Sequence, residues 1–339
     1  TGTVLAAAAG ARRGQTAFGR LWAGTLPATV TVLPNQPGFD WDKVRALPEV
    51  AALSEFAVVF GFSLDCCPAV STGFPPIGYG LTRTIERPAV IAGRLFNPQR
   101  VDEVMVTPQF AHVYHKGVGD TLVLHLATSE QMNEGFDGST GPPLGPQVTT
   151  RITGVGRSTW GSVTTDGPGL KGGVLSSPGL SDRYRANILG TNGQNYVNAV
   201  IRLKGGSTAI PAFRADLARV TGRPDIDVWD NREYFGGPVQ RITEYEAACL
   251  LAFALAALVA ALFLVGQSVA RYTSATVADL QVLQAVGMTP RQAVASATAP
   301  PLLAAAAGST LGVVAALVAS RWLPIALASY YERLPVIRS

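Results

Sequence analysis

The sequence predicts an α+β domain joined to transmembrane α-helices. Two observations lead to this fold class. The last third of the chain contains two long windows without charge, and the mixed region before them has strand-helix-strand patterns at both ends. Hydrophobic residues make up 47% of the 339 residues and charged residues only 15%. That balance is unlike the composition of a purely soluble protein.

The two uncharged windows are residues 247–266 and 299–319. A membrane span needs about 20 mainly apolar residues to cross a hydrocarbon core of about 30 Å. A buried core helix is the alternative interpretation, but core helices seldom stay uncharged over this length. We therefore expect transmembrane helices over residues 242–270 and 293–322.

The start of the sequence is expected to belong to the same membrane region. Residues 1–15 contain a short Ala-rich run followed by Arg12 and Arg13. The run is too short to span a membrane, and it lacks the basic start of a signal peptide. We expect it to be the end of a first transmembrane helix and its exit.

A β-α-β pattern opens the large mixed region, residues 16–241. This first half covers about residues 26–60 and begins with the alternating strand TVTVL. Asp40 is the expected N-cap of the short helix that follows. A second strand is expected near residues 51–60.

A second β-α-β pattern closes the same region over about residues 195–232. The strands YVNAVIRL and DIDVW flank a helix with apolar residues at helical spacing. Ser207 or Thr208 is expected to cap that helix, and Gly222 is expected to end it. Two such units commonly pack into one ferredoxin-like, porter-like layer.

The residues between these halves, about 61–194, predict a β-rich insert. Short alternating runs are separated by Gly, Pro, Asp and Asn: PAVIAG, DEVMVT, DTLVLHLA and TTRITGVG. Two further stretches, NEGFDGSTGPPLGPQ and TTDGPGLKGG, contain too much Gly and Pro for regular structure and are expected to be loops.

The search for catalytic chemistry finds no constellation. His112 and His115 form an H-x-x-H pair without a third ligand, so a solvent-facing pair is favoured over a metal site. No phosphate-binding G-x-x-x-x-G-K-[ST] loop and no G-x-S-x-G elbow occurs. We expect a non-catalytic protein without a cofactor or a metal.

Charge and cysteine patterns exclude two further classes. The net charge is +4, but Lys and Arg are dispersed without a basic stripe, so no nucleic-acid partner is expected. Cys66 and Cys67 are adjacent, and Cys249 lies in the first uncharged window. A disulfide between the adjacent pair and two thiols that are free or otherwise paired remain alternatives.

Two segments resemble a known family. Residues 90–124 contain a Gly-Arg pair, then Glu-Val before an apolar strand, then Val-Gly-Asp before the next strand. This order resembles the extracytoplasmic core domain of MacB/FtsX-type ABC transporter permeases, in its actinobacterial form. The matching residues, which we expect to be structural, are Gly93, Arg94, Glu103, Val104, Gly119 and Asp120.

The second segment follows the first uncharged window. ADLQVLQAVGMTPRQAV resembles the family signature after the second span, L-x-A-x-G-x-(T/S)-x-x-(Q/E). The resemblance implies contact with an ATPase at Asp279, Leu280, Leu283, Ala285, Gly287, Met288, Thr289 and Arg291. The family often has Arg where this chain has Gln284, so this helix carries less charge than is usual there.

The resemblance covers the chain in order and implies its topology and partners. A large extracytoplasmic domain, a multi-pass position in the cell (plasma) membrane and an extracytoplasmic segment at residues 323–339 are expected. Because the family has a fourth span that this sequence lacks, we expect part of a longer protein. The expected partners are a dimeric cytoplasmic ABC ATPase, a second permease copy or homologous half, membrane lipid, and an extracytoplasmic substrate-binding protein or hydrolase.

The expected working part is the turn at residues 271–292. A coupling helix over residues 275–286 is expected to lie along the cytoplasmic membrane face. Gly287 is expected to end it, and Thr289 to cap the next helix with Pro290 in its first turn. An ordinary loop between spans, which also needs a glycine and a cap, is the alternative.

Three functions remain open from the sequence. The first is a permease that couples ATP hydrolysis to export or extraction of an envelope substrate, such as a lipid, lipoprotein, peptide or drug. The second is a mechanotransmitting regulator that activates a cell-wall hydrolase. The third is a membrane-anchored extracytoplasmic receptor or adhesion module.

Overall fold

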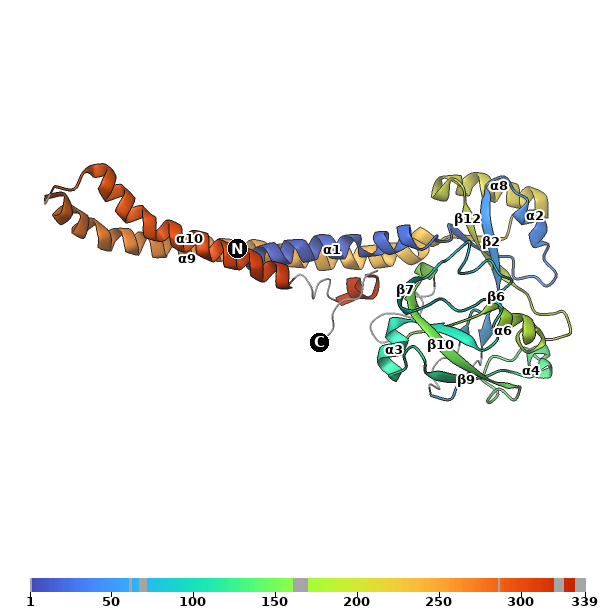
Figure 1. Ribbon diagram of the computed structural model, residues 1–339. Coiled ribbons are helices and arrows are strands. Elements are labelled where there is room, and N and C mark those ends of the chain that lie inside the picture. Colours follow the sequence, from blue (N-terminus) through green and yellow to red (C-terminus); the bar gives the residue numbers. More distant parts are fainter. Residues whose placement is uncertain are drawn as a thin grey trace. The chain divides into compact units, whose positions relative to one another are not determined.

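The computed structural model describes residues 2–60, 63–66, 72–160, 170–285, 287–319 and 326–332 (Figure 1). Its contacts divide the chain into two compact units. The α+β unit consists of Ala17–Gln240 and Tyr330–Pro335, and the helical unit consists of Thr1–Thr16, Arg241–Ser329 and Val336–Ser339. The last stretch of sequence, expected as one segment from residue 323, is therefore divided between the two units.

The first sheet of the α+β unit comes from the two expected β-α-β halves. Its strands are β1 (Val30–Leu33), β2 (Val50–Phe56), β12 (Asn198–Leu203) and β13 (Asp227–Asp230). They lie in the order β13-β1-β12-β2 with every neighbouring pair antiparallel. Counted along the chain this order is 4-1-3-2, which is the ferredoxin-like arrangement predicted from the sequence.

Two helices cover one face of this sheet: α2 (Trp41–Arg45) and α8 (Ile210–Thr221). Asp40 caps α2 as predicted, because its carboxylate accepts hydrogen bonds from the N–H groups of Asp42 and Lys43. Gly222 ends α8 in the left-handed conformation with φ of 69°, also as predicted. The helices bury Val44 and Phe213 completely against the sheet.

The predicted cap of α8 is wrong. Ser207 and Thr208 lie in the 3-10 turn η1 (Gly206–Ala209), and α8 has no side-chain cap. With Thr208 as cap, the third helical residue would be Pro211, which has no N–H to donate. The Thr208 hydroxyl instead donates to the carbonyl of Gly205 at 2.8 Å.

The expected strand over residues 51–60 is divided. β2 ends at Phe56, which pairs with Pro76 of the short strand β6 (Pro76–Ile77). The chain then forms β3 (Val59–Phe60), which pairs with β5 (Thr72–Gly73) in a separate two-stranded sheet. The N–H of Ala57 still donates to the carbonyl of Pro75 at 3.1 Å, but neither Pro75 nor Pro76 has an N–H to donate in return, and the ladder ends there.

The β-rich insert forms the second large sheet around one long central strand, β10 (Gln147–Arg157). β9 (Thr121–His125) pairs with its first part, β8 (Glu103–Val106) with its middle in parallel, and β7 (Ala89–Gly93) with its end. The edges are β4 (Ser63–Leu64) and β11 (Val174–Ser176). The surrounding short helices are α3 (Pro108–Tyr114), α4 (Ser129–Asn133), α6 (Pro178–Arg183) and α7 (Arg185–Leu189).

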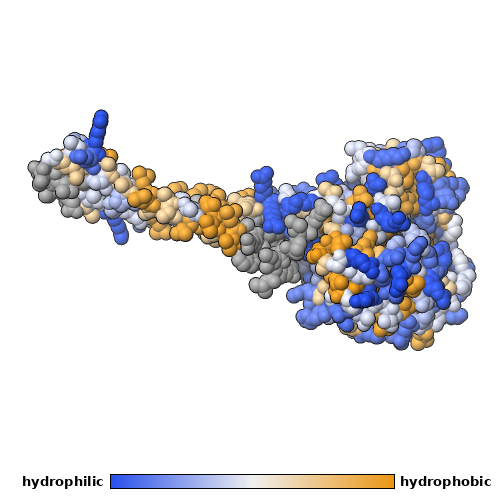
Figure 2. Space-filling model, viewed as in Figure 1, coloured by the Kyte–Doolittle hydropathy of each residue, from blue (hydrophilic) through white to orange (hydrophobic). Residues whose placement is uncertain are grey.

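The helical unit contains most of α1 (Gly2–Gly24) and of α9 (Gly237–Ala285), together with α10 (Pro290–Ala319) and the 3-10 helix η4 (Ala326–Tyr330). A short π-helix, η2 (Arg232–Gly236), precedes α9. Two helical segments of the described chain are long and apolar enough to cross a membrane, Arg232–Thr276 and Pro290–Ala319. Their apolar side chains are exposed, including Leu262 at 65% and Leu303 at 71%, and Figure 2 shows them as an apolar surface over these helices.

The expected coupling helix is not a separate element. Residues 275–285 are the last turns of α9, which runs unbroken over 49 residues from Gly237 to Ala285. No proline or glycine interrupts the sequence between residues 267 and 285, so no helix-breaking residue follows the uncharged window. Gly287 follows with φ of +105°, a conformation that favours glycine, as predicted.

Candidate functional site

The Gly-Arg pair lies where β7 meets the central strand β10. Gly93 has φ of +70°, and a Cβ atom there would overlap the carbonyl oxygen of Thr153 and lie 2.8 Å from Val118. The next residue continues the contact, since the N–H of Arg94 donates to the same carbonyl at 2.9 Å. Only glycine therefore fits at this crossing.

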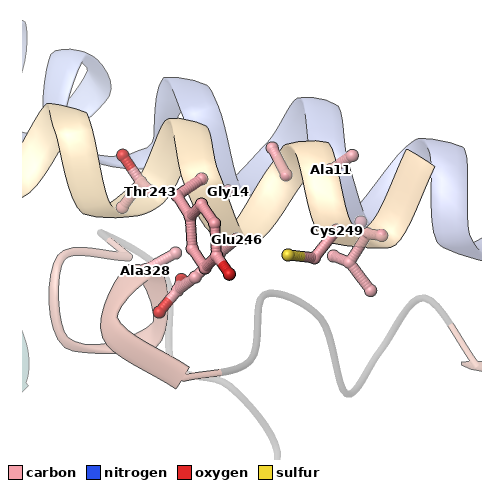
Figure 3. A pocket seen from close by; sticks show the side chains of 10 residues that line it. Ala11, Gly14, Thr243, Glu246, Cys249 and Ala328 are labelled. Carbon is pink, nitrogen blue, oxygen red and sulfur yellow. The ribbon is translucent and has the colours of Figure 1, made fainter. Parts of the chain in front are cut away.

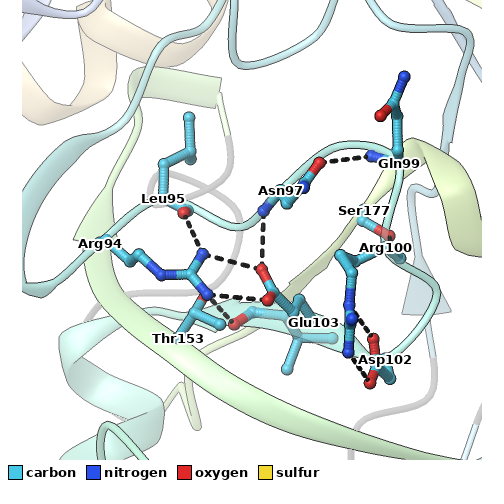
Figure 4. A network of polar contacts seen from close by, with 10 residues as sticks. Arg94, Leu95, Asn97, Gln99, Arg100, Asp102, Glu103, Thr153 and Ser177 are labelled. Atoms are coloured by element: carbon cyan, nitrogen blue, oxygen red, sulfur yellow. Dashed lines mark hydrogen bonds and ion pairs between the residues drawn. The ribbon is translucent and has the colours of Figure 1, made fainter.

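The arginine of the pair holds the glutamate that begins β8 (Figure 4). Nη1 and Nη2 of Arg94 donate to the two carboxylate oxygens of Glu103 at 2.9 and 2.8 Å. The N–H of Asn97 donates to the same carboxylate at 2.7 Å. The hydrogen bonds from Arg94 lower the pKa of Glu103 to about 2, with the Asn97 N–H contributing in the same direction.

The remaining motif residues also contact β10. Val104 is fully buried and pairs with Ile152 across the parallel ladder. Gly119, with φ of +101°, donates its N–H to the carbonyl of Ile152 at 2.8 Å. The carbonyl of Asp120 accepts from the N–H of Ile152 at 2.8 Å, and its carboxylate accepts from the N–H of Gly117 at 2.7 Å.

The six motif residues, up to 27 positions apart in sequence, thus meet along four residues of one strand, Arg151 to Gly154. Their polar groups bond to one another, to the backbone of β10 or to backbone groups of nearby residues. The arrangement orders β7, β8 and β9 around β10. The motif is a structural joint of the insert sheet.

The turn after α9 is described from Gly287 onward. Thr289 precedes α10, and both its N–H and its hydroxyl donate to the side-chain oxygen of Gln292, at 3.1 and 2.9 Å. This is the glutamine half of a capping box, with Pro290 at the first helical position. Gly287, Thr289 and Arg291 are exposed and Met288 is half-buried.

The other predicted ATPase-contact residues lie near the end of α9. Asp279, Leu280, Leu283 and Ala285 belong to α9, but their side chains lie outside the described part of the structure. Residue 286 lies outside it as well. Whether this segment has an apolar and a polar side therefore stays a prediction.

A buried carboxylate was not predicted from the sequence. Glu86 is 3% exposed and accepts hydrogen bonds from the N–H of Ala28 at 2.8 Å, the hydroxyl of Thr159 at 2.9 Å and the N–H of Trp160 at 3.1 Å. Burial raises the pKa of Glu86 to about 7, although these three donors act in the opposite direction. Glu86 lies in the ordinary-looking stretch TIERP, and nothing in that stretch marks it as buried.

A pocket of about 280 Å³ lies where α1 and α9 pack within the helical unit (Figure 3). Its walls combine small residues of α1 with polar and apolar residues of α9 and with Ala328: Gly10, Ala11, Gly14, Thr243, Tyr245, Glu246, Ala247, Cys249 and Leu250. Small side chains let two helices approach closely, as in many membrane-helix pairs. The pocket is a product of that close packing.

The described residues contain no group of His, Cys, Asp and Glu side chains that could hold a metal ion. His112 and His115 are both exposed, in agreement with the solvent-facing interpretation. Cys66 is disulfide-bonded and Cys249 is a free thiol, whereas Cys67 lies outside the described residues.

Comparisons with known proteins give likenesses to solved structures. No protein-family model and no curated protein matches this sequence. Among solved structures, the chain is similar to the crystal structure of the periplasmic region of MacB from Actinobacillus actinomycetemcomitans. The two share 9% sequence identity, with a TM-score of 0.37, over 65% of this chain and 97% of that one.

Proposed function

We propose that this chain is the membrane-spanning permease subunit of an ABC-type transporter in the cell membrane. In this proposal it is non-catalytic and pairs with a second permease copy or a homologous half. It couples ATP hydrolysis by a separate cytoplasmic ATPase to motion of its α+β unit outside the cytoplasm. That motion drives the export or extraction of an envelope substrate, such as a lipid, lipoprotein, peptide or drug.

The observation that carries the proposal is the continuity of α9. The helix begins at Gly237, within the last residues of the α+β unit, and ends at Ala285, two residues before Gly287. At 1.5 Å per residue its 49 residues measure about 73 Å, more than twice the thickness of a hydrocarbon core of about 30 Å. An unbroken helix of this length carries a displacement at one end to the other without a flexible joint.

The helix extends well past its apolar part. The uncharged window ends at residue 266, which leaves 19 residues, about 28 Å of helix, before Ala285. The first turn of α10 is likewise polar and capped by Thr289 with Gln292. We call the end of α9, the start of α10 and the short connection between them the tip, and we assign the tip to contact with a protein.

The residues given contain no phosphate-binding loop of the G-x-x-x-x-G-K-[ST] type. In this proposal a partner ATPase hydrolyses ATP, and the tip is the part we assign to it. The exposed apolar side chains of α9 and α10 are assigned to lipid and to the second permease copy or half.

The test is co-purification of an ATPase with the full-length chain from its native membranes. Met288→Asp places a charge on the half-buried residue of the tip, and deletion of residues 283–288 removes the connection. We expect both changes to abolish the ATP hydrolysis that co-purifies with the chain. The matched control is Thr310→Ala, because the Thr310 hydroxyl bonds only within α10, to the carbonyl of Ala306.

The outcomes separate the alternatives. An ATPase that co-purifies equally well with the deleted tip contradicts the assignment of this segment. Absence of any ATPase from the native complex favours the receptor or adhesion module. If ATP addition activates a cell-wall hydrolase and releases no envelope substrate, the regulator is the better description.

A further inference from the structure

The chain returns to the α+β unit after α10. Tyr331 and Glu332, which we call the clasp, belong to that unit, although η4 immediately before them is counted almost entirely in the helical unit. Both side chains of the clasp are 2% exposed. Two residues so far from the rest of the α+β unit in sequence are thus buried in it.

The glutamate of the clasp is held by a residue near the start of the α+β unit. Nη2 of Arg20, on α1, lies 2.8 Å from the Glu332 carboxylate across 312 residues of sequence. The carboxylate is almost inaccessible to water, whereas the arginine is 40% exposed. A buried carboxylate is costly unless it is paired, and Arg20 supplies a charged partner for Glu332.

The tyrosine of the clasp packs on the same helix. Its ring meets the ring of Phe18 edge to face, with 5.7 Å between centroids. Phe18 also packs closely on Gly236, where an added Cβ atom would lie 2.6 Å from the ring. One aromatic side chain of α1 therefore contacts both the residue before α9 and the segment after α10.

The clasp also reaches the insert sheet. Arg157, the last residue of β10 and 7% exposed, donates from Nη1 to the backbone carbonyl of Glu332. β10 is the strand on which the Gly93, Arg94 and Glu103 joint is built. The chain after α10 is thereby connected to the centre of the β-rich insert.

We infer that Tyr331 and Glu332 fasten the segment after α10 to α1 and β10, so that the chain next to the crossings after Thr16, after Gln240 and after Ser329 is tied together on the α+β unit. The fastening stands on the Arg20, Phe18 and Arg157 contacts alone. Its use in carrying motion from α10 to the insert rests on the proposed function.

The test is carboxylate footprinting of the full chain in detergent micelles, with a carbodiimide and glycine ethyl ester as the probe. Glu332 should be modified slowly in the wild type because it is buried. Arg20→Gln removes its charged partner and should raise the modification rate by about tenfold or more. Arg20→Lys keeps the positive charge and should restore most of the protection.

Two controls keep the result interpretable. Glu86 is equally buried inside the α+β unit and reports unfolding, since it becomes reactive only if the unit opens. Arg219→Gln removes an exposed arginine from its pair with Asp216 on α8 and should leave Glu332 protected. If Arg20→Gln unfolds the unit, Tyr331→Ala replaces it, because it removes the ring against Phe18 from a short segment that belongs to neither sheet.

The inference is overturned if wild-type Glu332 reacts as fast as the exposed Glu244, or if Arg20→Gln and Tyr331→Ala leave its rate unchanged in the folded protein. Footprinting needs no ATPase, so these results do not depend on the proposed function. Conversely, if an ATPase co-purifies equally well without the tip of α9, the proposed function is contradicted. A protected Glu332 would still support the clasp in that case.

Discussion

The carboxylate of Glu86 accepts a hydrogen bond from the backbone N–H of Ala28, 58 residues earlier in the chain, at 2.8 Å. Its second oxygen accepts from Thr159 and Trp160, just beyond β10. One buried side chain thus joins the residues leading into β1 to those leaving the insert sheet. The N–H of Glu86 adds a contact of its own, donating to the carbonyl of Leu26 at 2.8 Å.

Glu86 should make the α+β unit less stable as the pH rises. Its pKa is about 7 in the folded chain and near 4.5 when unfolded, so the folded state binds the additional proton between these values. The contribution of Glu86 to the free energy of unfolding is fully present below about pH 4.5. It is lost as the pH rises through 7, and the total loss is on the order of 3 kcal/mol. Glu86→Gln should remove this dependence.

The measurement is the thermal unfolding midpoint of the full chain from pH 5 to 8, for the wild type and for Glu86→Gln. The amide of Gln cannot accept hydrogen bonds on both of its terminal atoms, so the variant carries a constant loss near Trp160. Only the pH dependence of the difference in unfolding midpoint between the two proteins tests the titration of Glu86. Parallel curves for the two proteins would contradict a carboxylate that titrates near pH 7 in this position.

Gly93→Ala should destabilise the insert sheet by about 3 kcal/mol or more, because the added methyl group overlaps Thr153 and the backbone is held at φ of +70°. Gly117→Ala is the matched control in the same region, since a Cβ there meets nothing within 4 Å. The control should change the unfolding free energy by no more than about 0.5 kcal/mol. Denaturant unfolding measures the free energy of unfolding of both variants. Equal losses in Gly93→Ala and Gly117→Ala would contradict the close contact between Gly93 and Thr153.

Arg94→Gln should lower stability at neutral pH only modestly, because Arg94 is 60% exposed. The pKa of Glu103 is lowered to about 2, so its contribution is present above the unfolded value of about 4.5 and is lost as the pH falls toward 2. The difference in stability between the wild type and Arg94→Gln should therefore become smaller in acid. Unfolding midpoints at pH 7, 4 and 2.5 check this, and a gap that widens in acid would contradict it.

Gly287→Ala should strain the connection after α9 without a steric clash. Its φ is +105° and a Cβ there would meet no atom within 4 Å, so the cost is backbone strain of about 1 to 2 kcal/mol. We expect reduced co-purification of the ATPase with little change in the fold. Gly266→Ala, inside α9 and equally uncrowded, should leave co-purification unchanged.

Local patterns were sufficient for much of the first sheet. The alternation in TVTVL and YVNAVIRL predicted β1 and β12, and Asp40 and Gly222 marked helix ends that the structure confirms. The ferredoxin-like order follows from two β-α-β units in one layer. The predicted cap of α8 was wrong because the first residue of a helix can be predicted from sequence only to within one or two residues. Whether Pro211 prevents capping depends on that first residue.

The uncharged windows also determined the long helices, but not their limits. Apolar composition predicted both spans, while the continuation of α9 to Ala285 depends on the absence of any local stop after the window. A bend at the membrane face would have required such a stop or a packing partner. Sequence hydropathy reports what enters a membrane and says little about how far a helix continues beyond it.

The sequence by itself determined the fold class, the two apolar helices and the residues of the Gly-Arg motif. Only the tertiary structure decided that the motif meets on Arg151 to Gly154, that Glu86 is buried between Ala28 and Trp160, and that Glu332 reaches Arg20. The physical reason is distance along the chain. Burial and pairing depend on which segments pack together, and residues separated by 58 or 312 positions leave no periodic signal in the sequence.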